Sequence, residues 1–139
     1  MTATLAAPAP VRPRDRAALA GWGLTGLFAL FMLCASVLPK FAMTEMVRGG
    51  MAGLGWPDAP VLLIGALELA LTLLFLWPRA APLAAVLMTG LLGGAIATQM
   101  QAGSPLLSHT LFGIYLGAVM WAGLLLRNPR LRALLPWRS

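Results

Sequence analysis

Four long runs of apolar residues dominate the hydropathy pattern of this 139-residue chain. They cover residues 17–38, 61–77, 83–100 and 106–126, and only the second run contains a charged residue. An α-helix needs about 20 apolar residues to cross a bilayer, with a working range of about 17–25. Prolines lie between or beside the runs, where they disfavour helix continuation. The pattern predicts an all-α membrane protein whose four transmembrane helices, joined by short links, form an antiparallel bundle.

The segments outside these runs complete the predicted domain organisation. Residues 1–16, rich in Ala and Pro, are expected to form a disordered arm, and residues 128–139 a basic tail. The transmembrane domain then covers residues 17–127. Arginines precede the first run, as in a signal peptide, but its 22 residues exceed the about 7–15 of a signal sequence's apolar core. We therefore predict that the first run is a span.

The link between the first two runs has its own periodicity. Its apolar side chains recur at helical spacing, at Met43, Met46, Val47, Met51 and Leu54. Glu45 and Arg48 fall on the other side, and Gly53 and Gly55 follow. This pattern predicts a short amphipathic helix in the outer membrane interface, with Trp56 at headgroup depth. The alternative is an irregular loop.

Composition and charge support a membrane protein. The chain is 60% hydrophobic and 10% charged, whereas soluble domains are roughly 45–50% apolar and about 25% charged. The net charge is +6, which indicates either a nucleic-acid partner or cytoplasmic loops.

The positions of the basic residues decide between these two explanations. With four spans, one side carries eight of the ten Lys and Arg residues: Arg12, Arg14, Arg16, Arg79, Arg127, Arg130, Arg132 and Arg138. The other side carries Lys40 and Arg48. The positive-inside rule then predicts that both termini are cytoplasmic. No basic stripe alternates with stacking aromatic residues, so no nucleic-acid partner is expected. The Arg-, Ala- and Gly-rich composition is typical of a GC-rich bacterial genome, so we expect a bacterial inner membrane.

The inventory of reactive residues is short. Cys34 is the only cysteine and His109 the only histidine, which excludes an intrachain disulfide, a CxxC redox centre and a Cys- or His-rich metal site. No motif pairs a nucleophile with a base, so the sequence identifies no catalytic residue. It does not predict an enzymatic activity of the chain's own.

Glu68 is the most informative residue. It lies seven positions after Val61, about 10 Å along its helix and inside the hydrocarbon region. A carboxylate there should face the bundle interior, where it has either a functional role or a structural one in hydrogen bonding between helices. Lys40 follows the first span on the same side, with Ser36 one turn below it. Lys40 either pairs with Glu68 or extends to the headgroups.

Other polar residues are expected at the same depth. They complete a candidate polar chamber in the outer half of the bundle, made of Ser36, Lys40, Glu68, Thr98, Gln99 and His109. His109 either caps a helix or titrates together with Glu68. Small residues at helical spacing predict close helix packing at Gly65, Gly90, Gly94, Gly113 and Gly117. This packing would serve either the bundle or a homo-oligomer face.

Several short motifs together resemble a known family. The first span ends in Lys40 and Phe41, the outer link closes in LGWP at 54–57, and IGALELA follows at 64–70. The turn WPR at 77–79 and LLGGAIATQ at 91–99 complete the pattern. These motifs resemble the DoxX-like family of small four-helix bacterial membrane proteins. Family members carry a His near the end of the third span, where this chain has Gln99.

The resemblance implies a role in a membrane complex and does not imply a particular chemical reaction. The family takes its name from a subunit associated with a thiosulfate:quinone oxidoreductase, and relatives are linked to membrane redox and stress-response complexes. It implies a non-catalytic accessory subunit with a redox-complex partner, no intrinsic cofactor, and a possible bound quinone or lipid. The alternative is a proton-coupled small-molecule carrier or channel that uses Glu68. An enzyme that acts on a lipid-soluble substrate ranks last.

Overall fold

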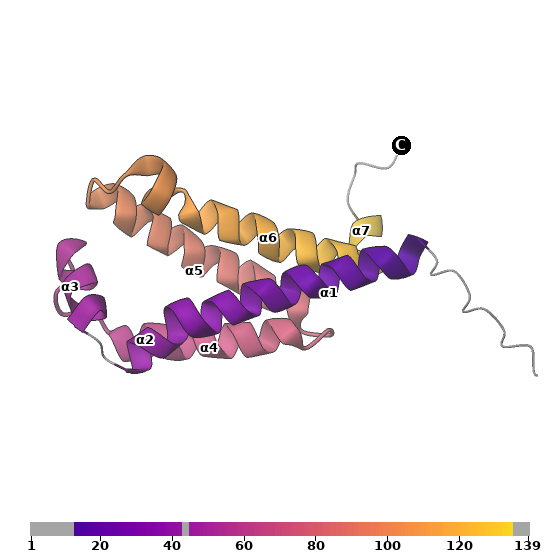
Figure 1. Cartoon of the computed structure of the whole chain (residues 1–139), viewed down its shortest axis with the longest axis horizontal. Coiled ribbons are helices and arrows are strands. Elements are labelled where there is room, and N and C mark those ends of the chain that lie inside the picture. The colour runs from indigo at the N-terminus through magenta and orange to yellow at the C-terminus, as the bar shows by residue number, and fades with distance from the viewer. Residues whose placement is uncertain (1–12, 43–44, 135–139) are drawn as a thin grey trace, which may run out of the picture.

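The computed structural model describes residues 13–42 and 45–134, and within these ranges it contains helices but no strand (Figure 1). The all-α prediction is therefore confirmed for the described residues. The elements in chain order are α1 (Pro13–Phe31), η1 (Met32–Val37), α2 (Leu38–Phe41), α3 (Glu45–Gly53), α4 (Val61–Leu76), α5 (Ala81–Gln101), η2 (Leu106–Thr110), α6 (Phe112–Arg127) and α7 (Pro129–Ala133).

The first three elements form one continuous helix that contains a wider π-helical segment, η1. Pro39 follows this segment closely and lies in the first turn of α2. A proline inside a helix donates no hydrogen bond, and its ring clashes with the carbonyl four residues earlier, here that of Ala35. The wider turn accommodates this clash, since its hydrogen bonds reach five residues back in place of four, as from the backbone nitrogen of Leu38 to the oxygen of Leu33.

The predicted disordered arm at 1–16 is corrected at its carboxyl end. The first turn of α1 contains residues 13–16, because Pro13 suits the first position of a helix, where no hydrogen-bond donor is needed. Residues 1–12 of the arm, residues 135–139 of the tail and Met43 of the amphipathic pattern lie outside the described residues.

Three helices are long and apolar enough to cross a membrane: Arg16–Phe41, Ala81–Gln101 and Leu106–Arg127. The fourth apolar helix, Val61–Leu76, has 16 residues and is shorter than these three. Large apolar side chains are also exposed on the outer faces of all four, for example Leu27, Leu63, Leu83 and Ile114. A soluble protein rarely exposes so much apolar surface, so these faces indicate contact with lipid.

The long helices lie side by side (Figure 1), with α1 packed on α6, α6 on α5, and α5 on α4. The ring closes where α4 packs against η1 and α2. The start of α1, the end of α6, α7 and the turn between α4 and α5 lie at one end, here called the terminal end. The opposite end, with α2, α3 and the link between α5 and η2, is called the loop end.

The tightly packed core lies in the half of the molecule toward the terminal end. Phe28 of α1 and Phe75 of α4 meet edge to face, with ring centroids 5.5 Å apart. Met88, Met120 and Leu124 are also fully buried beside them. These side chains come from all four long helices, so this half holds the bundle together.

A close contact between α1 and α6 anchors the same half. A Cβ atom at Gly21 would lie 2.6 Å from the backbone nitrogen of Arg127, and one at Gly123 would lie 3.0 Å from Thr25 Oγ1. Only glycine allows the two backbones to approach so closely. The sequence analysis missed this contact, although small residues spaced four apart, at Gly21 and Thr25, were a signal for it.

Candidate functional site

A cavity of about 880 Å³ occupies the half of the molecule toward the loop end. Its walls come from the end of α1, η1, α2, α4, α5, η2 and α6. Met51 of α3 and Leu54 and Trp56 of the link that follows it also line the cavity. Most lining residues are apolar, among them Phe31, Leu67, Leu91, Ile96 and Leu116. A concave site of this size, with mostly apolar walls and a few polar groups, is typical of small-molecule pockets.

All six residues of the candidate polar chamber line this cavity: Ser36, Lys40, Glu68, Thr98, Gln99 and His109. Their side chains do not form a single cluster. Ser36, Lys40 and Glu68 bond to one another on one wall, while the contacts of Thr98 and His109 are to other residues.

The first wall holds a buried ion pair. Lys40 Nζ lies 2.9 Å from Glu68 Oε2, and the two side chains are only 12% and 10% exposed. This is the pairing that the sequence analysis offered as one of two alternatives for Lys40. Because Glu68 lies at the eighth residue of the 16-residue α4, the charge of its carboxylate is compensated by Lys40 at the middle of an apolar helix.

Ser36 connects the two charged groups. Its Oγ donates to Glu68 Oε2 at 3.0 Å and accepts from Lys40 Nζ at 2.7 Å. Lys40 Nζ also donates to the backbone oxygen of Ser36 at 3.2 Å. The three donors of the ammonium group therefore have three acceptors, which is what a buried charge requires.

Gly65 makes this arrangement sterically possible. It lies one turn before Glu68 on α4, and a Cβ atom there would lie 3.1 Å from Lys40 Cβ. The absence of a side chain lets α2 approach α4, so Lys40 reaches the carboxylate. Gly65 therefore lies where α2 and α4 approach each other closely.

The polar side chains that α5 and η2 contribute to the cavity have different partners. Thr98 Oγ1 donates to the backbone oxygen of Gly94 in its own helix. His109 is exposed, and its Nδ1 lies 2.8 Å from Ser108 Oγ. The structure thus pairs the imidazole with its sequence neighbour and not with Glu68.

Gln99 differs from every other polar residue of the cavity. Its Oε1 atom is buried, and it is one of three buried side-chain polar atoms in the described residues without a hydrogen-bond partner. An unsatisfied buried acceptor costs about 1–3 kcal/mol. A ligand that brings a hydrogen-bond donor to this atom would remove that cost.

The glycines predicted for close packing have different surroundings in this chain. A Cβ atom at Gly90 or Gly94 would meet no neighbour within 4 Å, and both residues line the cavity. They leave space and do not bring helices of this chain together. Gly113 does serve close packing, since its Cβ would lie 2.9 Å from Ile96 Cγ1, whereas Gly117 makes only an ordinary contact with Leu92.

The link 39–60 contributes more to the site than the sequence analysis foresaw. A helix, α3, does form in it over Glu45–Gly53. Met51 and Leu54, expected on its apolar face, line the cavity, and so does Trp56, which was expected at headgroup depth. The helical spacing of these side chains predicted that they share one face of the helix. It did not predict that this face lies against the cavity.

Comparison with known families agrees with this architecture. The model of the DoxX-like family matches residues 23–123, most of the chain. The chain belongs to the DoxX-like family. No curated protein and no solved structure matches it.

The matched segment contains every residue that lines the cavity, from Phe31 to Leu116. The cavity is therefore built entirely from the part of the chain that this DoxX-like protein shares with its family. The resemblance that the sequence motifs suggested is confirmed, and the apolar helices are consistent with an integral membrane protein.

Proposed function

We propose that this DoxX-like protein crosses a bacterial inner membrane four times, with both termini in the cytoplasm. Three helices are long enough to span, and α4, with 16 residues, extends about 24 Å at 1.5 Å per residue. Arg79, Arg127, Arg130 and Arg132 lie on elements at the terminal end. This excess of arginine supports a cytoplasmic terminal end.

We propose further that the cavity binds a quinone and that the protein is an accessory subunit which presents this quinone to a redox partner. The observation that carries the proposal is the unsatisfied Oε1 atom of Gln99 in an otherwise apolar cavity of about 880 Å³. The hydroxyl group of a reduced quinone is a donor for that atom, and apolar walls suit its ring and isoprenoid tail. The ion pair of Lys40 and Glu68 supplies a fixed polar wall.

The ion pair favours binding over proton-coupled transport. A carrier that loads a proton on Glu68 must first separate the carboxylate from Lys40, 2.9 Å away, and from Ser36. Breaking a buried pair is costly because it leaves a charge without a partner. We therefore rank the carrier second.

The test uses the full chain purified in a mild detergent and titrated with a short-chain ubiquinol, the reduced form of the quinone whose hydroxyl group can donate to Gln99 Oε1. Gln99→Leu removes the unsatisfied acceptor, and Gln101→Leu is the matched control, since Gln101 is exposed and does not line the cavity. We expect Gln99→Leu to weaken quinone binding about fivefold, the effect of one hydrogen bond of about 1 kcal/mol. Gln101→Leu should bind as the parent chain does.

Two results would contradict the proposal. One is equal quinone affinity in all three proteins, and the other is no saturable binding at all. Reconstituted vesicles test the alternative: substrate uptake that depends on a proton gradient and is lost in Glu68→Gln would favour the carrier.

A further inference from the structure

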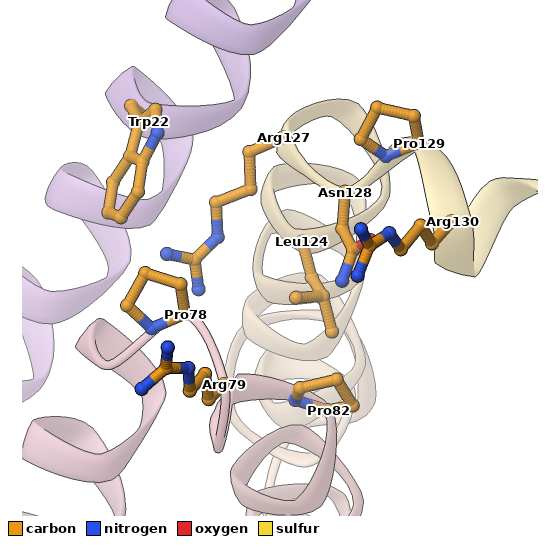
Figure 2. Close-up of a pocket in the computed structure, with 9 residues that line it drawn as sticks. All are labelled: Trp22, Pro78, Arg79, Pro82, Leu124, Arg127, Asn128, Pro129 and Arg130. Atoms are coloured by element: carbon orange, nitrogen blue, oxygen red, sulfur yellow. The ribbon is translucent and has the colours of Figure 1, made fainter.

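A second pocket, of about 680 Å³, lies at the terminal end and has opposite chemistry (Figure 2). Its described lining residues are Trp22, Pro78, Arg79, Pro82, Leu124, Arg127, Asn128, Pro129 and Arg130. Three of these nine are arginines, and none is acidic. A pocket with three positive charges and no carboxylate among its described residues attracts anions.

Arg127 is held in place by its neighbours. Its Nη2 donates to the backbone oxygen of Phe75 at 2.7 Å. The guanidinium lies over the rings of Trp22 and Phe75, with its central carbon 4.4 and 4.8 Å from their centroids. Figure 2 shows the side chain reaching from α6 toward Trp22 and Pro78. Such stacking orients the planar group before any ligand arrives.

The remaining nitrogens of Arg127 lack acceptors. Nε and Nη1 are both buried and without a hydrogen-bond partner. A buried donor without a partner is costly, and more so when it is charged. An anion that enters the pocket supplies oxygen acceptors to these groups and compensates the charge of Arg79 and Arg130, which are exposed at its rim.

We propose that this pocket binds a phosphate group, and its position favours the headgroup of an anionic phospholipid. Arginine forms paired, charge-assisted hydrogen bonds with phosphate oxygens. The pocket lies where the apolar helices end, which is the depth of lipid headgroups. Trp22, Leu124 and the prolines give it apolar walls that suit the glycerol region of a lipid.

This site is independent of the quinone cavity and extends beyond the family match. Trp22, Arg127, Asn128, Pro129 and Arg130 all lie outside residues 23–123, which match the family. No residue lines both pockets. Loss of quinone binding would therefore leave this proposal standing, and the reverse also holds.

The test measures lipid retention by the full chain in a neutral detergent. Phosphatidylglycerol or phosphatidylcholine is titrated in, and bound lipid is counted by native mass spectrometry. Arg79→Gln with Arg130→Gln removes two charges from the pocket, whereas Arg16→Gln with Arg132→Gln removes two charges at the same end outside it. A third arm compares inorganic phosphate with chloride at equal ionic strength, using the unfolding temperature of each protein.

We expect the parent chain to prefer phosphatidylglycerol. Substituting both Arg79 and Arg130 with Gln, the pocket pair, should weaken this binding about 30-fold. Substituting both Arg16 and Arg132 with Gln, the control pair, should change the affinity by no more than about threefold, because solvent ions screen charges that lie farther from the lipid. Equal loss in both pairs, or no preference over phosphatidylcholine, would overturn the proposal. Stabilisation by inorganic phosphate that the pocket pair alone abolishes, without lipid preference, would support the phosphate site and overturn its lipid source.

Discussion

The two halves of this DoxX-like protein are built from the same four long helices, yet one half is packed and the other is hollow. Toward the terminal end, Phe28 and Phe75 stack edge to face, and Gly21 lets α6 approach α1. Toward the loop end, Gly90 and Gly94 of α5 face open space, and the cavity lies there. Gly21 of α1 and the two glycines of α5 therefore have opposite effects, set by what lies across from each of them.

The two halves also differ in the polar atoms that they leave unsatisfied. Among the described residues, the buried side-chain atoms without partners are Gln99 Oε1 in the hollow half and two nitrogens of Arg127 at the terminal end. The first is an acceptor and the others are charged donors, so the two sites call for ligands of opposite polarity. This difference separates the two proposed ligands: a reduced quinone, whose hydroxyl group donates a hydrogen bond, and a phosphate, whose oxygens accept several.

The largest effect is expected from Glu68→Leu in the hollow half. This change leaves the ammonium group of Lys40 buried without its carboxylate, which costs about 3–5 kcal/mol. The free energy of unfolding in a denaturing detergent series measures it. Glu45→Leu is the matched control, because its carboxylate is 91% exposed and lies 3.8 Å from Arg48.

The double change Lys40→Met with Glu68→Leu completes this test. It removes both charges and should recover most of the lost stability, since apolar side chains replace a buried pair at little cost. A double variant as unstable as Glu68→Leu would mean that the carboxylate stabilises the hollow half through contacts other than Lys40.

The sequence predicted the helical fold and offered the pairing of Lys40 with Glu68 as one of two alternatives. Pro60, Pro78 and Pro105 indicated helix boundaries, whereas Pro39 lies inside a continuous helix. Lys40 and Glu68 were the charges expected near one depth. A charged side chain in the hydrocarbon region must face the bundle interior or a polar cavity. A charge within a span therefore indicates that polar residues lie near it. That reasoning predicted which residues line the cavity, and the structure places all six there.

The contacts that the sequence did not predict depend on what lies across from each helix. Spacing assigned Gly90 and Gly94 to one face of α5, but it did not show that this face meets empty space. In the same way, Arg127 was counted as a topology signal, while its stacking on Trp22 joins residues about a hundred positions apart. Contacts between residues far apart in the sequence depend on how the helices pack together. The hydrophobic periodicity of a single helix does not predict them.

The next effect is expected in the packed half, from Gly21→Ala. The added methyl group would lie 2.6 Å from the backbone nitrogen of Arg127, so α1 and α6 must separate, at about 1–3 kcal/mol. Gly23→Ala, two residues later in the same helix, meets nothing within 4 Å. It should be neutral or stabilising in the same unfolding measurement. Equal effects of both changes would show that α1 does not depend on this contact.

A smaller effect is expected from Asn128→Ala at the terminal end. The Asn128 side chain caps α7 by accepting from the backbone nitrogen of Leu131 at 3.2 Å. Its loss should cost about 1 kcal/mol of helix stability and loosen α7, which carries Arg130. Amide hydrogen exchange in α7 measures the change. Asn128→Asp keeps the cap, so its exchange should match that of the parent chain.

The smallest effect on stability is expected from Gly94→Ala, which is also the most direct comparison with Gly21→Ala. Both changes add one methyl group to a glycine in the middle of a long helix, but at Gly94 that group meets no atom within 4 Å. Alanine is the better helix former by about 0.5–1 kcal/mol, so this variant should be slightly more stable than the parent chain. The same methyl group enters the cavity, where it should lower quinone affinity without unfolding the protein. A destabilised Gly94→Ala chain would mean that the hollow half closes around α5 in the membrane, because a methyl group is unfavourable there only if another atom occupies its place.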